Sequence, residues 1–180
     1  GSSYHACLVA SYIMSKVSKL HINVVLASEF PHYVHYLTDK TLIITVSQSG
    51  ETADVLEAVK SAKTKKSKII SLVNVVGSSL TRSSDMFLNI NAGPEICVLS
   101  TKTYTSQLAL FTLLSYALND RYEEGRKKLT YLWNEIYHLT SATTREKITE
   151  LAEKLQDKEH IFLIGRGLQY ATALEAALKI

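Results

Sequence analysis

Short apolar runs of strand length alternate along the first two thirds of the chain with longer stretches in which apolar residues recur at helical spacing. The apolar runs predict four buried strands, at residues 22–27, 41–46, 68–73 and 86–90. The helical patterns predict helices at residues 4–20, 52–63, 79–82 and from about 101 onward, with at most a short helix at 32–37. Strands that alternate with crossover helices form a parallel sheet covered on both faces, so the predicted fold class is α/β.

Beyond residue 119 the sequence becomes charged and helical, over residues 121–138 and 143–156. An apolar run at residues 160–164 then predicts another buried strand, followed by a glycine-containing turn and a helical pattern that reaches Ile180. One strand and one helix cannot bury their own apolar faces, so a second domain of the same type is expected to begin here. The expected division is a first domain at 1–120 that lacks its first strand, a helical connection at 121–158 and a truncated second domain at 159–180.

The composition fits a globular protein. Of the 180 residues, 46% are hydrophobic and 21% are charged, which argues against both disorder and a membrane-spanning chain. Basic residues cluster only at 63–68 and 126–128, and such clusters are more often solvated surface than nucleic-acid sites. The two cysteines lie far apart and no signal peptide is visible, so we expect a cytoplasmic protein.

No metal or cofactor is expected. The six histidines show no metal-ligand spacing, and residues 165–167 lack the third glycine of a dinucleotide-binding turn. Trp133 and Tyr137 are four residues apart, which favours a buried helix face over a cofactor site.

The most distinctive chemistry lies at residues 47–52, Ser-Gln-Ser-Gly-Glu-Thr, between a predicted strand and the helix that follows. This segment, called here the 47–52 turn, offers three hydroxyls, one side-chain amide and a glycine beside the free N–H groups of a helix start. Such a helix start attracts phosphate, and hydroxyl donors complete the shell around it. The alternative is that Ser49 only caps the helix. One cap explains one serine and leaves the other hydroxyls and the amide unexplained, so the phosphate interpretation is favoured.

Four motifs together resemble the sugar isomerase (SIS) half of the glucosamine-6-phosphate synthase family, also called glutamine:fructose-6-phosphate aminotransferases. They are Gly-Ser-Ser-Tyr-His-Ala at 1–6, Ser-Gln-Ser-Gly-Glu-Thr-Ala-Asp at 47–54, Ala-Gly-Pro-Glu-Ile at 92–96 with Ser-Thr-Lys at 100–102, and Gly-Arg-Gly at 165–167 with Ala-Leu-Glu-Ala-Ala-Leu-Lys at 173–179. The resemblance implies a flavodoxin-like, three-layer αβα SIS domain and the start of a second one. Three residues depart from the family pattern: Ser2 stands where threonine is usual, and Cys97 and Leu99 replace smaller residues.

The resemblance also implies which residues touch the substrate. The sugar 6-phosphate would be held by Ser3, Ser47, Gln48, Ser49 and Thr52. The sugar end would be contacted by Ser2, Ser100 and the backbone of Val98. Lys179 matches a lysine of the family's isomerase site, although without the resemblance a surface lysine on an amphipathic helix is the better interpretation. Glu95 is given no catalytic role, because beside Pro94 it could simply cap the following helix.

The implied activity is that of an amidotransferase that converts fructose 6-phosphate and glutamine-derived ammonia into glucosamine 6-phosphate. In family members the proton-transfer glutamate, the ring-opening histidine and the Schiff-base lysine follow the position of Ile180, and neither Cys7 nor Cys97 matches the glutaminase nucleophile. The 180 residues alone are therefore expected to be inactive. The expected partners are the sugar phosphate, a glutaminase domain in the full-length chain and a second copy of the protein, without nucleic acid or membrane.

Two further expectations concern the class of protein and the isolated chain. The alternative to an enzyme is a regulatory module that binds a phosphosugar without transforming it, because the same turn would serve binding equally well. A polypeptide of these residues alone is expected to be poorly soluble or partly unfolded, because the helical patterns at 4–20 and 170–180 would leave apolar surface uncovered.

Overall fold

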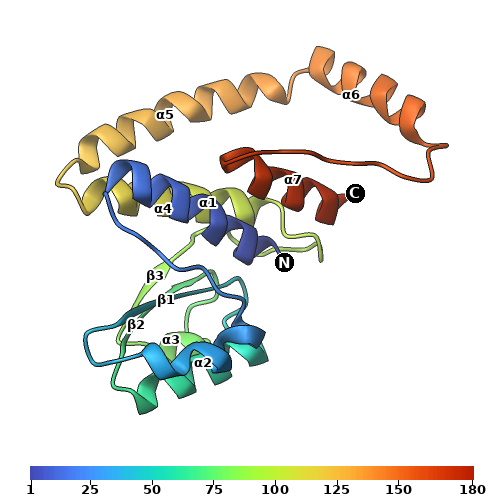
Figure 1. Cartoon of the computed structure of the whole chain (residues 1–180). Coiled ribbons are helices and arrows are strands. Elements are labelled where there is room, and N and C mark those ends of the chain that lie inside the picture. The colour runs from blue at the N-terminus through green and yellow to red at the C-terminus, as the bar shows by residue number, and fades with distance from the viewer.

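A three-stranded parallel sheet lies at the centre of the first part of the molecule (Figure 1). The computed structural model describes residues 1–180. The strands are β1 (Leu42–Ser47), β2 (Lys68–Val73) and β3 (Met86–Asn89), in the order β1-β2-β3. Leu42 lies opposite Lys68, and Ile70 lies opposite Met86. This confirms the parallel α/β class, and three of the four predicted strands form within one residue of the expected bounds.

Helices cover both faces of the sheet (Figure 1). On one face lie α1 (Ser2–Val17) and α4 (Lys102–Ala117), and on the other lie α2 (Ala53–Thr64), α3 (Ser79–Ser83) and a 3₁₀ helix, η1 (Ala27–Tyr36). The first face buries a cluster made of Ala6, Ala10, Met14, Leu72, Ile90 and Phe111. The second face buries a cluster made of Val59, Ala62, Ile69, Val73 and Leu80. β2 serves both clusters because successive side chains of a strand point to opposite faces.

The second part of the chain is helical. The helices α5 (Tyr122–Leu139) and α6 (Ala142–Leu155) form an arm above the first part, and the chain then returns so that α7 (Leu168–Lys179) packs against α1 (Figure 1). This return places the end of the chain beside its beginning. No helix is both long and apolar enough to span a bilayer.

Two predicted strands do not form. Residues 21–26 run without regular structure, and residues 160–164 are also irregular. Phe162 and Ile164 are 86% and 93% exposed. A strand is stable only when a neighbour completes its hydrogen-bond ladder, and neither segment has a partner strand in the sheet. The predicted short helix at 32–37 is part of the longer η1, which contains Pro31.

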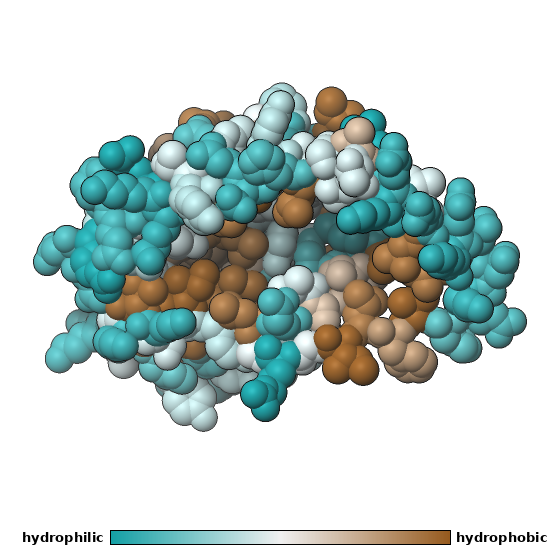
Figure 2. All heavy atoms as spheres, turned by 90° about the horizontal axis from the view of Figure 1, so that it is seen from above, coloured by the Kyte–Doolittle hydropathy of each residue, from teal (hydrophilic) through white to brown (hydrophobic).

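One expectation about buried apolar surface is wrong. Trp133 and Tyr137 do not mark a buried face, because they are 69% and 71% exposed. They share one side of α5, as their spacing predicts, but both side chains are mostly exposed on it. The expectation that the isolated chain is poorly soluble stays a prediction. α1 buries Ala6, Val9, Ala10 and Met14, whereas Tyr170 and Leu178 of α7 are 49% and 48% exposed. Viewed from above, hydrophobic side chains gather in hollows between hydrophilic flanks (Figure 2).

Candidate functional site

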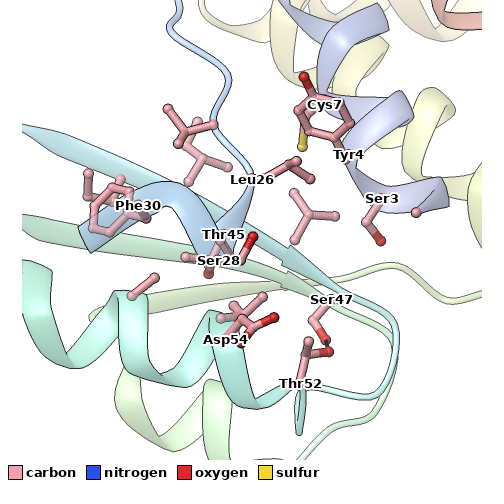
Figure 3. A pocket seen from close by; sticks show the side chains of 18 of the residues that line it. Ser3, Tyr4, Cys7, Leu26, Ser28, Phe30, Thr45, Ser47, Thr52 and Asp54 are labelled. Atoms are coloured by element: carbon pink, nitrogen blue, oxygen red, sulfur yellow. Dashed lines mark hydrogen bonds between the residues drawn. The ribbon is translucent and has the colours of Figure 1, made fainter. Parts of the chain in front are cut away.

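A large open cavity lies beside β1, at the edge of the sheet that no other strand covers (Figure 3). Its volume is about 1430 Å³. All nine site residues expected from the sequence line it: Ser2, Ser3, Ser47, Gln48, Ser49, Thr52, Val98, Ser100 and Lys179. These residues come from four segments that are far apart in the chain, so folding gathers them around one space.

The 47–52 turn forms one wall of the cavity. Ser47 ends β1 and is buried, and its Oγ accepts a hydrogen bond from the Gly50 N–H at 3.0 Å and lies 2.9 Å from Thr52 Oγ1. Gly50 has a φ of +70°, which glycine adopts without the steric penalty of other residues. A Cβ there would lie 2.1 Å from Ser78 Oγ, so the turn also needs the small residue for space.

Ser49 does not cap α2. The N-cap residue of α2 is Thr52, and no side chain hydrogen-bonds to the first N–H groups of this helix. Ser49 Oγ instead accepts a hydrogen bond from the Glu51 N–H at 3.2 Å, within the turn. The Ser49 hydroxyl therefore keeps its own proton available as a donor toward the cavity, beside a helix start whose N–H groups have no side-chain partner.

Contacts with α3 fix the turn from behind. Glu51 Oε1 accepts a hydrogen bond from the Ser79 N–H at 2.7 Å, and the Gly50 carbonyl accepts one from the Leu80 N–H at 3.0 Å. The hydrogen bond from the Ser79 backbone holds the pKa of Glu51 below its usual value. The carboxylate is thus engaged with α3 and does not compete with an anion for the donors of the turn.

A second helix start faces the same cavity. Gly1 is the N-cap of α1, Ser2 and Ser3 occupy its first turn, and this turn contains no acidic residue. The N-terminal ends of α1 and α2 both carry partial positive charge from the helix dipole. Two such ends and a group of hydroxyls around one cavity make a site suited to an anion.

Lys179 is not a free surface lysine. Its side chain is 23% exposed, and its Nζ lies 2.9 Å from Glu175 Oε1. Nζ also donates to Ser2 Oγ at 2.8 Å and to the Leu99 carbonyl. These partners come from α7, from α1 and from the segment before α4, so the ammonium group is held in place at the cavity wall.

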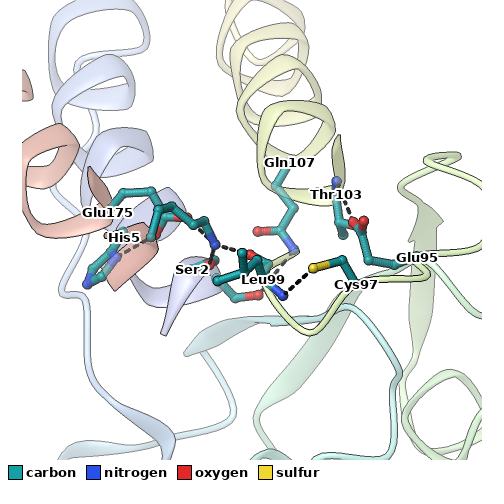
Figure 4. A network of polar contacts seen from close by, with 10 residues as sticks. Ser2, His5, Glu95, Cys97, Leu99, Thr103, Gln107 and Glu175 are labelled. Carbon is teal, nitrogen blue, oxygen red and sulfur yellow. Dashed lines mark hydrogen bonds and ion pairs between the residues drawn. The ribbon is translucent and has the colours of Figure 1, made fainter. Parts of the chain in front are cut away.

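Sequence reasoning missed two residues behind Lys179. The Glu175 carboxylate accepts from His5 Nδ1 through Oε2 at 2.7 Å, and the two side chains are 7% and 12% exposed (Figure 4). Burial raises the pKa of Glu175, but hydrogen bonds from His5, Lys179 and Ser2 outweigh it and leave the pKa below its usual value. The i, i+4 spacing of Glu175 and Lys179 was a signal for their ion pair, whereas nothing local pointed to His5, which is 170 positions away.

Glu95 caps α4, which agrees with the capping interpretation drawn from its place beside Pro94. Its Oε2 accepts from the Thr103 N–H at 3.2 Å and from Thr103 Oγ1 at 2.6 Å, in the first turn of the helix. The hydroxyl of Thr103 holds the pKa of Glu95 below its usual value. The Glu95 carboxylate is therefore engaged in stabilising the start of α4.

The family model described as "SIS domain" matches residues 1–117. The chain belongs to the SIS domain family. The glutamine-fructose-6-phosphate aminotransferase (isomerizing) of Pyrococcus horikoshii is 43% identical over 183 residues, which cover 100% of this chain and 31% of that protein. The corresponding protein of Clostridium tetani is 42% identical over 187 residues, with 100% and 31% covered. This SIS chain thus spans about a third of the length of the relatives that it matches.

A solved structure shares the arrangement of the whole chain. It is the C-terminal domain of glucosamine-fructose-6-phosphate aminotransferase from Francisella tularensis, with a TM-score of 0.86 and 37% identity. The alignment covers 99% of this SIS chain and 52% of that domain. The flavodoxin-like, three-layer αβα fold expected from the motifs is confirmed by this likeness.

Proposed function

We propose that this chain is the phosphosugar-binding isomerase part of an amidotransferase that makes glucosamine 6-phosphate from fructose 6-phosphate and glutamine-derived ammonia. The observation that carries the proposal is the cavity in which two helix starts, the 47–52 turn and Lys179 meet. The names of the relatives support the same activity.

The phosphate is proposed to lie against the 47–52 turn and the start of α1. Donors available there are the hydroxyls of Ser3 and Ser49, the Gln48 amide and the backbone N–H groups of two first turns. Ser47 and Thr52 are hydrogen-bonded to each other, so this pair has one further hydroxyl proton to donate. Hydrogen bonds to a charged acceptor are worth about 1.5–3 kcal/mol each, so a few of them bind a dianion without a dedicated lysine.

The reacting carbons of the sugar are proposed to lie toward Ser2, Val98, Ser100 and Lys179. Conversion of a ketose derivative to an aldose moves a proton between neighbouring carbons by general acid–base catalysis. Negative charge develops on the adjacent oxygen during this step, and a preorganised ammonium stabilises such charge. Lys179 meets this requirement because Glu175, Ser2 and the Leu99 carbonyl hold its Nζ in one position.

The same proposal extends to the domain organisation of the full-length protein. The division into a first SIS domain at 1–120, a helical connection at 121–158 and the beginning of a second SIS domain at 159–180 fits the helical arm formed by α5 and α6. A glutaminase domain elsewhere in the full-length chain would supply ammonia, and a homodimer in the cytoplasm is the proposed state.

The test is synthesis of glucosamine 6-phosphate by the full-length protein supplied with fructose 6-phosphate and ammonia. Lys179→Met should lower kcat by about 100-fold to 1,000-fold, the range for loss of one donor that stabilises charge developing on an oxygen. Lys60→Met removes a lysine whose side chain is 78% exposed on α2, and should leave the rate unchanged. A wild-type protein that binds fructose 6-phosphate but forms no product would show a sensing module in place of the enzyme.

A further inference from the structure

Gln107 lies behind the phosphate side of the cavity without lining it. It belongs to α4, is 1% exposed, and reaches across to α1, where its Nε2 donates a hydrogen bond to Ser3 Oγ at 3.1 Å (Figure 4). Ser3 itself lines the cavity. Gln107 therefore contacts Ser3, a residue proposed to bind the phosphate, from the side that faces the protein interior.

The direction of this hydrogen bond decides what Ser3 can do. A serine hydroxyl has one proton to donate and two lone pairs that accept. Serines inside helices use the proton on the preceding turn, as Ser115 does when it donates to the Phe111 carbonyl at 2.7 Å. The Ser3 hydroxyl makes no such bond within α1, and its side-chain hydrogen bond is the one that it accepts from Gln107. Since Ser3 accepts from Gln107, its proton is left for a group in the cavity.

A second observation indicates that the amide serves more than packing. The other end of the Gln107 amide, Oε1, is buried without any hydrogen-bond partner. An unpaired buried acceptor lowers stability, and an apolar side chain of the same length would fill this space without that cost. The hydrogen bond to Ser3 is thus the one polar interaction that the Gln107 amide makes.

We infer that Gln107 is a positioning residue that orients the Ser3 hydroxyl as a donor to the phosphate of the bound sugar. The inference rests on the proposed function, because it takes the ligand to be a sugar phosphate. It adds a residue of α4, outside the cavity wall, to the group that determines phosphate affinity.

A double-mutant cycle on the full-length protein tests this inference. The dissociation constant of fructose 6-phosphate is measured by calorimetry for wild type, Gln107→Met, Ser3→Ala and the double variant. Loss of one hydrogen bond that orients Ser3 should weaken binding about 2-fold to 12-fold in Gln107→Met. Ser3→Ala should weaken it about 10-fold to 150-fold, because the bond lost there reaches a charged group. The double variant should bind no more weakly than Ser3→Ala.

Two further backgrounds separate positioning from general disturbance. In Thr52→Val, whose hydroxyl is bonded to Ser47 and not to Ser3, Gln107→Met should keep its full effect. Ser115→Ala removes another buried polar group of α4 and should leave the affinity unchanged. Gln107→Glu preserves the shape of the side chain, but its carboxylate can only accept and would draw the Ser3 proton away from the cavity, so it should bind more weakly than Gln107→Met.

The outcomes are distinguishable. Wild-type affinity for fructose 6-phosphate in both Gln107 variants would overturn the inference. So would a Gln107→Met substitution that weakens binding by the same factor in the wild-type and the Ser3→Ala background. Wild-type protein that binds fructose and fructose 6-phosphate equally would overturn the proposed phosphate site itself. Circular dichroism confirms the fold of each variant, and Gln107→Glu supplies the same comparison if Gln107→Met is unstable.

Discussion

Gly50→Ala adds a single methyl group at the centre of the 47–52 turn, where the structure leaves no room for one. The added Cβ would lie 2.1 Å from Ser78 Oγ, 2.6 Å from Ser78 Cβ and 2.8 Å from Val73 Cγ1. The backbone there has a φ of +70°, which disfavours any residue with a Cβ. Two independent penalties therefore act at one position.

Their sizes can be added. A residue with a Cβ in the left-handed region costs roughly 1–2 kcal/mol. Forcing an extra methyl group into a packed region typically costs about 1–3 kcal/mol more, because side chains and backbone must shift. Gly50→Ala should thus lower the free energy of unfolding by about 2–5 kcal/mol.

Gly77→Ala is the matched control. Gly77 has a φ of +81°, but a Cβ there would meet nothing within 4 Å. It should show only the backbone penalty, about 1–2 kcal/mol. Thermal unfolding followed by circular dichroism, with urea unfolding as a second measure, compares the two variants. Equal destabilisation of Gly50→Ala and Gly77→Ala would refute the claim that Ser78 and Val73 enclose the turn.

Three other predictions use the polar groups outside the turn. Glu95→Ala should lower the free energy of unfolding by about 0.5–2 kcal/mol through loss of the α4 cap. Glu135 is exposed on α5, so Glu135→Ala should leave the free energy of unfolding unchanged, and equal melting temperatures for the two variants would contradict the cap. Because the pKa of Glu175 lies below its ordinary value of 4.5, its charge stabilises the fold at neutral pH and this contribution disappears as the pH falls through the lowered pKa. The difference in urea midpoint between wild type and Glu175→Gln should therefore shrink below pH 4.5, and a constant difference would oppose this. Burial of its sulfur raises the pKa of the half-buried Cys7 to about 12, so maleimide should label the exposed Cys97 first at neutral pH, as mass spectrometry can verify. Faster labelling of Cys7 would contradict the raised pKa of its thiol.

Local patterns predicted the part of the fold that local interactions determine. The strand at 41–46 and the turn that follows it are encoded in adjacent residues, and the structure has them as β1 and the 47–52 turn. The apolar run at 22–27 has the same character but forms no strand, because a strand also needs a partner in the sheet. Apolar periodicity reports which residues favour burial and does not report whether a neighbour is present to bury them.

The same distinction applies to the site. Ser47, Ser49 and Thr52 could be predicted together because they lie within six residues of one another. His5 and Gln107 could not, because each acts on a residue far away in the chain, at separations of 170 and 104. Neither belongs to a motif whose chemistry is visible by itself. Only the packing of α7 and α4 against α1 brings these side chains to the residues that they contact.

The central claim is that the 47–52 turn holds a phosphate, and calorimetry of sugar binding tests it most directly. Fructose 6-phosphate and fructose are each titrated into the full-length protein, as wild type, as Ser49→Ala, and as Ser61→Ala, which removes a serine of α2 outside the cavity. Wild type should strongly prefer the phosphorylated sugar, and Ser49→Ala should weaken its binding about 10-fold to 150-fold while Ser61→Ala does not. Equal binding of the two sugars by wild type, or an unchanged preference in folded Ser49→Ala, would contradict the claim.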